Sequence, residues 1–484
     1  MTTDKSHPLR RAVALAAAAL AAACGGKTGA APRHVSISAI ATQLAEDGTT
    51  TGDSPLPLTF PSIQLDDGST PPVTAVAPGR WSADVPSGPY WFVAGDVRYR
   101  ASGDTLDLGY VTTARAQAAP PANSTPAALT LSGLQQWIAG QDTIQLFSWG
   151  ANSWDAFDPK LTAGLTSATV NENWNTPAYG HGALNLLTPT DTLYAIQYRK
   201  SHDAGNGIDY QHVAAVASAS GMSMTNGLPF SATLSAMSVP AQAATLSLSW
   251  RTSQFEAATP QFSYRFGHQL AIFAEVMQPG GERPLAASPN LLDFTPPMNA
   301  SGTTPDLTLS SLVYGRFLPA QYREILYSGW VGGVSRVTSS SASNSYAFMY
   351  VVRYDSVDAI PSPLVPLVSS VRTVQISGRD ATVVQSGVGL RPIISWTAPA
   401  VGTPSRYVVK LYSLPPAGGD WQVVSTLNLP GSTTSVQLPT GLQQSGRVYY
   451  LWISAQAGTS TDAAPLRSGL PAGAASYATE VYSP

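Results

Sequence analysis

Aromatic residues stand beside carboxylates and amides in two neighbouring stretches of the chain, and these are the first residues whose types suggest chemistry. A flat indole or phenol ring can hold the apolar face of a sugar, while nearby polar groups fix its hydroxyls. The pattern therefore predicts a site for a carbohydrate or a peptide. Its candidate ligand-binding residues are Trp149, Trp154, Asp155, Glu172, Trp174 and Tyr179.

Two other interpretations of the same stretches stay open. Large aromatic side chains also close the ends of β-sandwiches, so these residues can equally be core packing. Glu172 with Asp155 or Asp158 could form the carboxylate pair of a glycoside hydrolase. Exposure separates the first two interpretations, because buried rings offer no face to a ligand.

A second polar group lies in the glycine-rich stretch from His202 to Asp209. Asp203, Asn206 and Asp209 carry oxygen ligands of the kind that calcium prefers. The spacing is not that of an EF-hand, and Asn206-Gly207 is a turn dipeptide between two strand-like runs. We expect a hairpin turn here, with a cation site as the weaker alternative.

Motifs of nucleophilic or metal-dependent catalysis are absent from the sequence. It contains no G-x-S-x-G, S-x-x-K or H-E-x-x-H pattern. His181, His202, His212 and His268 have no i,i+4 or H-x-H spacing, so we interpret them as structural or surface residues. The sequence predicts no catalytic residue, no cofactor and no defined reaction.

The amino-terminal stretch has the layout of a bacterial secretory signal. Lys5, Arg10 and Arg11 precede an apolar run over 12–23. As a helix this run would rise only about 18 Å, against about 30 Å for the hydrocarbon core of a bilayer. The run is therefore expected to be a leader and not a membrane span.

The leader ends in Leu20-Ala-Ala-Ala-Cys24-Gly25, which resembles the lipobox of bacterial lipoproteins. The leucine stands four places before the cysteine, where the family has it three before. The resemblance implies cleavage before Cys24, a diacylglycerol on its sulfur and acylation of the new amino terminus. Cys24 is the single cysteine of the chain. We expect a lipid-anchored envelope protein, and Gly25 is compatible with the outer membrane.

Two alternatives to lipidation remain. The leader could be an ordinary secretory signal with Cys24 as a bystander, and Arg10-Arg11 could belong to a twin-arginine signal.

Composition excludes one class of partner. The chain has 484 residues, a formal net charge of −3, and 11% charged residues, compared with about 25% in typical domains. Nucleic acid binding requires clustered Lys and Arg, so we expect none. The expected partners are the membrane, through the anchor, and a protein or polysaccharide at the cell surface.

Apolar residues recur with a period of two along most of the chain, separated by Pro and Gly, as in Val35-Ser-Ile37-Ser-Ala39. The pattern predicts an all-β fold of several sandwiches. The expected division is a leader at 1–23, a tether at 24–34, a small sandwich at 35–115, a linker at 116–127, one or two sandwiches at 128–362, and a last domain at 363–484.

Two of these parts resemble known modules. The segment from Gly79 to Val93 resembles the carboxypeptidase-regulatory-like, transthyretin-like sandwiches. The last domain resembles a fibronectin type III domain, through Trp396, Tyr407, Val409, Leu442, Tyr449 or Tyr450, Ile453 and Ala455. The first resemblance implies a structural module without chemistry, and the second implies a spacer or contact surface without activity. The expected function is an interaction or scaffold role, and carbohydrate binding through the 149–181 aromatics is the alternative.

Overall fold

The computed structural model describes residues 32–484 except 46–48, 57, 113–124, 151–152, 158–160, 175–190, 225–226, 237–243, 260–261, 277–288, 318–321, 337–344, 415–419, 459 and 468. These described residues form strands almost throughout, with a short helix α2 (Thr252–Ala257) and a 3₁₀ turn η3 (Val357–Ala359). The predicted all-β class with sandwich architecture is confirmed.

The amino-terminal part is a small structure of two packed layers. Val35 and Ile37 are buried while His34 and Ser36 are exposed, which is the alternation of a half-buried strand. One sheet has the order β5-β6-β1-β9, and its apolar face packs on β4, β7 and β8. The strands are β1 (Arg33–Ser38), β2 (Ile40–Leu44), β3 (Thr50–Pro55), β4 (Ser62–Gln64), β5 (Thr74–Ala77), β6 (Arg80–Val85), β7 (Tyr90–Ala94), β8 (Val97–Ala101), β9 (Thr105–Asp107) and β10 (Tyr110–Thr112).

A second sandwich follows, in which β14 and β17 flank β11 while β12 and β16 flank β15. Leu129 and Leu131 from β11 are buried in one core with Ile144 from β12 and Leu193 from β15. Its strands are β11 (Thr125–Ser132), β12 (Asp142–Ser148), β13 (Ser153–Phe157), β14 (Ser167–Trp174), β15 (Thr192–Asp203), β16 (Ile208–Ser220) and β17 (Phe230–Ala236).

The next strands form a long curved wall with a cover on one side. β19, β20, β22 and β23 make the wall, and the pair β18–β21 with α2 lies against it. These strands are β18 (Ala244–Trp250), β19 (Tyr264–Val276), β20 (Asn290–Phe294), β21 (Leu307–Tyr314), β22 (Tyr322–Arg336) and β23 (Ser345–Ser356).

The carboxyl-terminal part is a sandwich of two four-stranded layers. One layer has the order β25-β24-β26-β29 and the other β28-β27-β30-β31. Trp396 and Tyr407 meet between the layers with ring centroids 5.2 Å apart. The strands are β24 (Arg372–Ile376), β25 (Arg379–Asp380), β26 (Ile393–Thr397), β27 (Arg406–Leu414), β28 (Gln422–Pro430), β29 (Ser435–Gln437), β30 (Val448–Ala457) and β31 (Ala472–Ala478).

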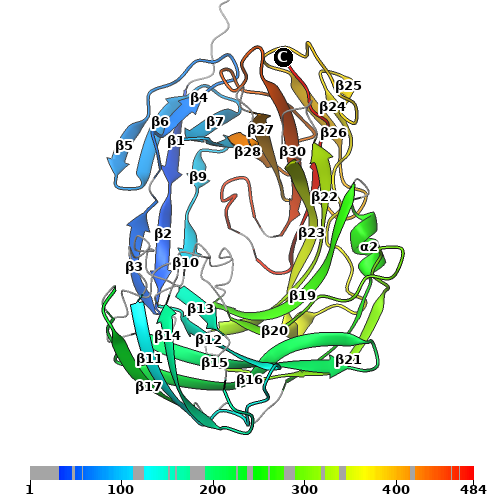
Figure 1. The fold of residues 1–484 in the computed structure, drawn as a ribbon. Coiled ribbons are helices and arrows are strands. Elements are labelled where there is room, and N and C mark those ends of the chain that lie inside the picture. Colours follow the sequence, from blue (N-terminus) through cyan, green and yellow to red (C-terminus); the bar gives the residue numbers. More distant parts are fainter. Residues whose placement is uncertain are drawn as a thin grey trace, which may run out of the picture.

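The parts are joined by one continuous sheet. Its strands pair in the order β16-β20-β19-β22-β23-β31-β30-β27-β28-β8. Val352 pairs with Ala474, so hydrogen bonding crosses the predicted boundary at 362/363, and Leu427 pairs with Arg98 of the amino-terminal part. Figure 1 shows the result, a chain closed into a ring with blue strands beside orange and red ones.

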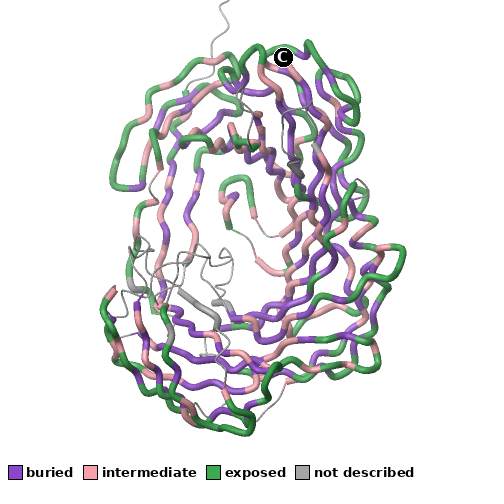
Figure 2. Tube along the Cα trace, viewed as in Figure 1, coloured by how far each residue is buried: buried purple, intermediate pink, exposed green. Residues whose placement is uncertain are grey.

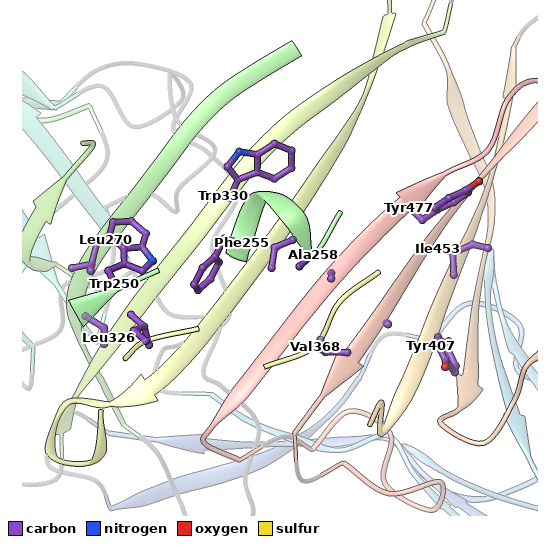
Figure 3. Packing of buried hydrophobic residues seen from close by; sticks show 14 of the residues in the cluster. Trp250, Phe255, Ala258, Leu270, Leu326, Trp330, Val368, Tyr407, Ile453 and Tyr477 are labelled. Carbon is purple, nitrogen blue, oxygen red and sulfur yellow. The ribbon is translucent and has the colours of Figure 1, made fainter. Parts of the chain in front are cut away.

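The sheet has an outer and an inner face along this wall. On the outer face, α2, β21 and β24–β26 form a second layer (Figure 1). The core between the layers is a single cluster that includes Trp250, Trp330, Tyr407 and Ile453, and Figure 3 shows Phe255 of α2 within it. In Figure 2 the wall strands are largely buried while turns on the outside are exposed. The inner face of the wall carries the features described next.

Candidate functional site: an aromatic pocket on the inner face

A pocket of about 470 Å³ opens on the inner face of the continuous sheet. Its walls come from β22, β23, β27, β30 and β31. Its roof comes from the segment between β30 and β31, of which residues 458, 460–467 and 469–471 are described. We name these residues the strap. Gly458, Ser460, Gly469 and Leu470 of the strap line the pocket. The volume lies within the range of about 300–1,000 Å³ that is usual for small-molecule sites.

The pocket exists because β31 carries small residues where its neighbours carry large ones. Ala472 pairs with Tyr354, and Ala474 lies between Val352 on β23 and Gln456 on β30. Directly paired residues point to the same face of a sheet. The two alanines therefore form a shallow floor between taller walls, and all five of these residues line the cavity.

Three tyrosines form the aromatic wall. The rings of Tyr327 and Tyr354 have centroids 5.3 Å apart, and Tyr350 packs on Trp452 at 5.5 Å. Burial raises the pKa of Tyr350, so its hydroxyl keeps its proton at neutral pH. The wall thus combines flat apolar rings with hydroxyl groups able to donate hydrogen bonds.

A glycine sets the orientation of one of these rings. A Cβ atom at Gly329 would clash with the Tyr327 hydroxyl, with the ring close behind. The phenol side chain therefore lies along β22 over the bare backbone of Gly329. Its long axis runs along the strand and not straight out from the sheet.

The polar end of the pocket is built by Arg406 and Gln456. The Arg406 Nε donates to the Gln456 Oε1 at 2.5 Å, and a terminal nitrogen of Arg406 donates to the carbonyl of Pro465 in the strap. The hydroxyls of Ser405 and Ser460 lie 2.8 Å apart at the same end. Side chains on the sheet are thus hydrogen-bonded to the roof.

The lining of the pocket combines aromatic rings with neutral polar groups and one guanidinium. The described residues that line the pocket include no Asp, Glu, His or Cys, so these residues supply no carboxylate, imidazole or thiol to a ligand. No group of three or more metal-ligating side chains occurs in the described part of the chain. What the lining residues offer is aromatic surface, hydroxyls, an amide and a guanidinium.

None of the residues predicted to bind a ligand at 149–181 lines this pocket. Trp149 is fully buried, with its ring 4.7 Å from Phe147, 5.0 Å from Tyr194 and 4.7 Å from Tyr322. The prediction that Trp149 binds a ligand is wrong, because its indole fills the core where β12 and β15 meet the wall. Trp149 therefore packs and offers no accessible face.

The other five residues of that prediction are placed only through their backbone, or not at all. Trp154 and Asp155 on β13 pair with β12, and Glu172 and Trp174 on β14 pair with β11, so the register does not pair the two sets with each other. Their side chains, like Tyr179 and Asp158, lie outside the described residues. Carbohydrate binding by these residues stays a prediction.

The stretch from His202 to Asp209 has the hydrogen bonds of a hairpin turn. Asp209 pairs with His202 across the strands, so it shares a face with His202, whereas Asp203 points to the other face. Asp203 accepts hydrogen bonds from the Asn206 side chain at 2.7 Å and the Gly205 amide at 3.1 Å, and Asp209 lies 2.7 Å from the His202 ring nitrogen. The carboxylates are thus used separately and do not converge on one ion.

Cys24 and the leader lie outside the described residues. No helix in the described part of the chain is long and apolar enough to cross a membrane. The pocket-lining tyrosines and alanines were missed in the sequence, where the available signal was the run of small residues at every second position of 472–478. No protein family and no curated protein matches this chain.

Proposed function

We propose that this chain is a lipid-anchored envelope protein that binds a carbohydrate in the inner-face pocket without transforming it. The observation that carries the proposal is the composition of the pocket: Tyr327, Tyr350 and Tyr354 beside Gln456 and Arg406, with no carboxylate in the described lining. The role is an interaction role, as expected from the two module resemblances, and the polysaccharide is its partner.

The chemistry of a sugar ring fits this arrangement. A pyranose has an apolar face of C–H groups that packs on an aromatic ring, and equatorial hydroxyls that need donors and acceptors at its edge. The tyrosine rings offer an aromatic face to the C–H groups of the sugar. Gln456, Ser405 and Ser460 offer hydrogen-bond donors and acceptors to its hydroxyls. The floor of Ala472 and Ala474 leaves the space that the ring would occupy.

The carboxyl-terminal part is proposed to be a fibronectin type III module. Support comes from its two layers, in which β24, β26 and β29 face β28, β27, β30 and β31, and from the burial of all the positions that carry the resemblance. The amino-terminal sandwich is likewise proposed to be carboxypeptidase-regulatory-like. In both, the fold acts as a support for the pocket.

The anchor is proposed to be the lipidated Cys24. The first described strand starts at Arg33, so eight residues lie between the proposed lipidated cysteine and β1, and the chain can reach at most about 30 Å when extended. Mass spectrometry of the mature amino terminus tests this directly. A diacylglyceryl cysteine is the expected result, and an unmodified sulfur at this position would contradict it.

Glycan-array binding with three proteins tests the pocket. Ala474→Leu fills the floor from the inner face, away from the core, and is expected to abolish binding that the unchanged protein shows. Ala77→Leu makes the same change on β5, where the alanine is exposed, and is expected to bind normally. If the unchanged protein retains no glycan, or if Ala474→Leu binds equally well, the proposal is wrong.

A further inference from the structure

Three exposed aromatic side chains stand together near the end of the wall. Tyr264, Phe266 and Phe348 are 51%, 49% and 59% exposed, and the rings of Phe266 and Phe348 have centroids 5.4 Å apart. Single exposed apolar residues are common, but clustered ones mark binding surfaces. We name these three residues the platform.

The platform lies on the same face of the sheet as the pocket. Tyr264 pairs with Gly333, and Gly333 pairs with Phe348, so Tyr264 and Phe348 project to one side. The next row on that side is Val331 paired with Tyr350, and both of these residues line the pocket. The platform therefore begins one row beyond the pocket wall.

The backbone between the platform rings is bare. Gly333 has no side chain between Tyr264 and Phe348, which leaves a gap of one strand between them. Phe266 is the extra residue of a β-bulge between Arg265 and Gly267, and Gly267 has a φ of +114° that favours glycine. The bulge directs the Phe266 ring toward Phe348 across the gap.

Aromatic packing through the buried Trp452 connects the platform to the pocket wall. The Trp452 indole donates to the carbonyl of Phe348 at 2.9 Å, and its ring packs on Tyr350. Phe348 and Tyr354 are six residues apart on β23, about 20 Å along an extended strand. This distance is several times the width of one six-membered ring.

We propose that the pocket and the platform bind one linear glycan chain, with one sugar ring in the pocket and a later ring of the same chain on Tyr264, Phe266 and Phe348. The inference rests on the proposed carbohydrate function and adds the chain length of the ligand. A rigid row of aromatic faces suits a polymer because each face holds another ring without demanding a particular substituent.

Calorimetric titration with oligosaccharides of increasing length tests the inference. The probes are glucose to cellohexaose, N-acetylglucosamine to chitohexaose, and maltose to maltohexaose. We expect the unchanged protein to bind the hexamer of one series roughly tenfold more tightly than its dimer. Phe348→Ala and Phe266→Ala are expected to remove this gain and to leave the dimer affinity unchanged.

Controls separate this inference from the pocket proposal. Phe60→Ala removes a distant phenylalanine that is 87% exposed, and it should keep the gain with length, whereas Ala474→Leu should lose binding at every length. Affinity independent of length overturns the chain inference and leaves the pocket proposal standing, and binding of no series overturns both. If Phe348→Ala alters self-association in light scattering but not the gain with length, the platform is an interface between copies and the inference is wrong.

Discussion

Gly329 determines how Tyr327 is presented to a ligand. Gly329→Ala is expected to push the phenol off the strand and to weaken sugar binding roughly fivefold, because a displaced ring loses part of its stacking contact. The atom that must give way is the end of a side chain, so the free energy of unfolding should change by less than about 1 kcal/mol. Titration calorimetry and urea unfolding measure the two effects, and unchanged affinity would contradict the assignment of Tyr327.

His268 makes the stability of the wall sensitive to acid. Its ring is buried beside Trp250, with Nε2 3.1 Å from the Thr252 carbonyl, and burial lowers the pKa of His268 to about 4. The pKa of histidine in the unfolded chain is about 6.5, so the unfolded state binds a proton first as the pH falls. The contribution of neutral His268 to the free energy of unfolding is complete above pH 6.5. It is lost as the pH falls from 6.5 to about 4, and the loss reaches about 3 kcal/mol.

Comparison with His268→Gln isolates this contribution. Urea unfolding of both proteins from pH 7 to pH 4 should show a shallower loss of stability for the variant. Carboxylates that titrate in the same range are present in both proteins and cancel in the difference. Parallel curves would mean that His268 is not kept neutral by its surroundings.

Single residues also show the limit of prediction from sequence. The strand period correctly predicted buried Val35, Ile37 and Trp396, because it depends only on neighbours along one strand. The period could not show that Trp149 is a core residue and not a ligand-binding one, since a tryptophan in the core and one in a binding site have the same local sequence. Burial of an indole is set by strands that are distant in the chain.

At the scale of elements, β22 shows how one strand serves two purposes. Trp330 points to the outer face, where it is fully buried against Phe262 at 5.0 Å, while Val331 points to the pocket. Trp330→Ala is therefore expected to destabilise the protein by about 3–5 kcal/mol through the cavity that it leaves. Urea unfolding measures the loss, with the exposed Val384→Ala as the control, and a loss below about 1 kcal/mol would place Trp330 outside the core.

The pairing of elements explains why the pocket could not be predicted. Tyr354 and Ala472 are more than a hundred residues apart, and they become neighbours only because β23 adds to the edge of β31. The predicted boundary at 362/363 falls in a stretch with prolines at 361, 363 and 366, and prolines interrupt strands. The hydrogen bonds nevertheless cross from one part to the other, and this contact forms the pocket.

At the scale of the whole molecule, the strap is tied to the amino-terminal part. The Asp107 amide donates to the Ala463 carbonyl at 2.6 Å, and the Asp107 carboxylate pairs with Arg467 at 2.8 Å. Asp107→Ala is expected to accelerate amide hydrogen exchange in residues 460–467 several-fold, because a partly exposed ion pair contributes up to about 1 kcal/mol. Asp84→Ala breaks an exposed pair with His34 elsewhere in the same part, and it should leave strap exchange unchanged.

The ring closure at β8 and β28 has a mechanical consequence. The Thr426 amide donates to the Asp96 carbonyl at 2.9 Å, and Arg98 donates to the Ser425 hydroxyl at 3.1 Å. If the amino terminus is held in a membrane and a polymer is held in the pocket, tension between them crosses this short seam together with the contacts of Asp107 to the strap. Force on this route does not pass through the second sandwich or the wall strands β19 and β20. A pulling force would therefore load the β8–β28 contact before it deformed the second sandwich.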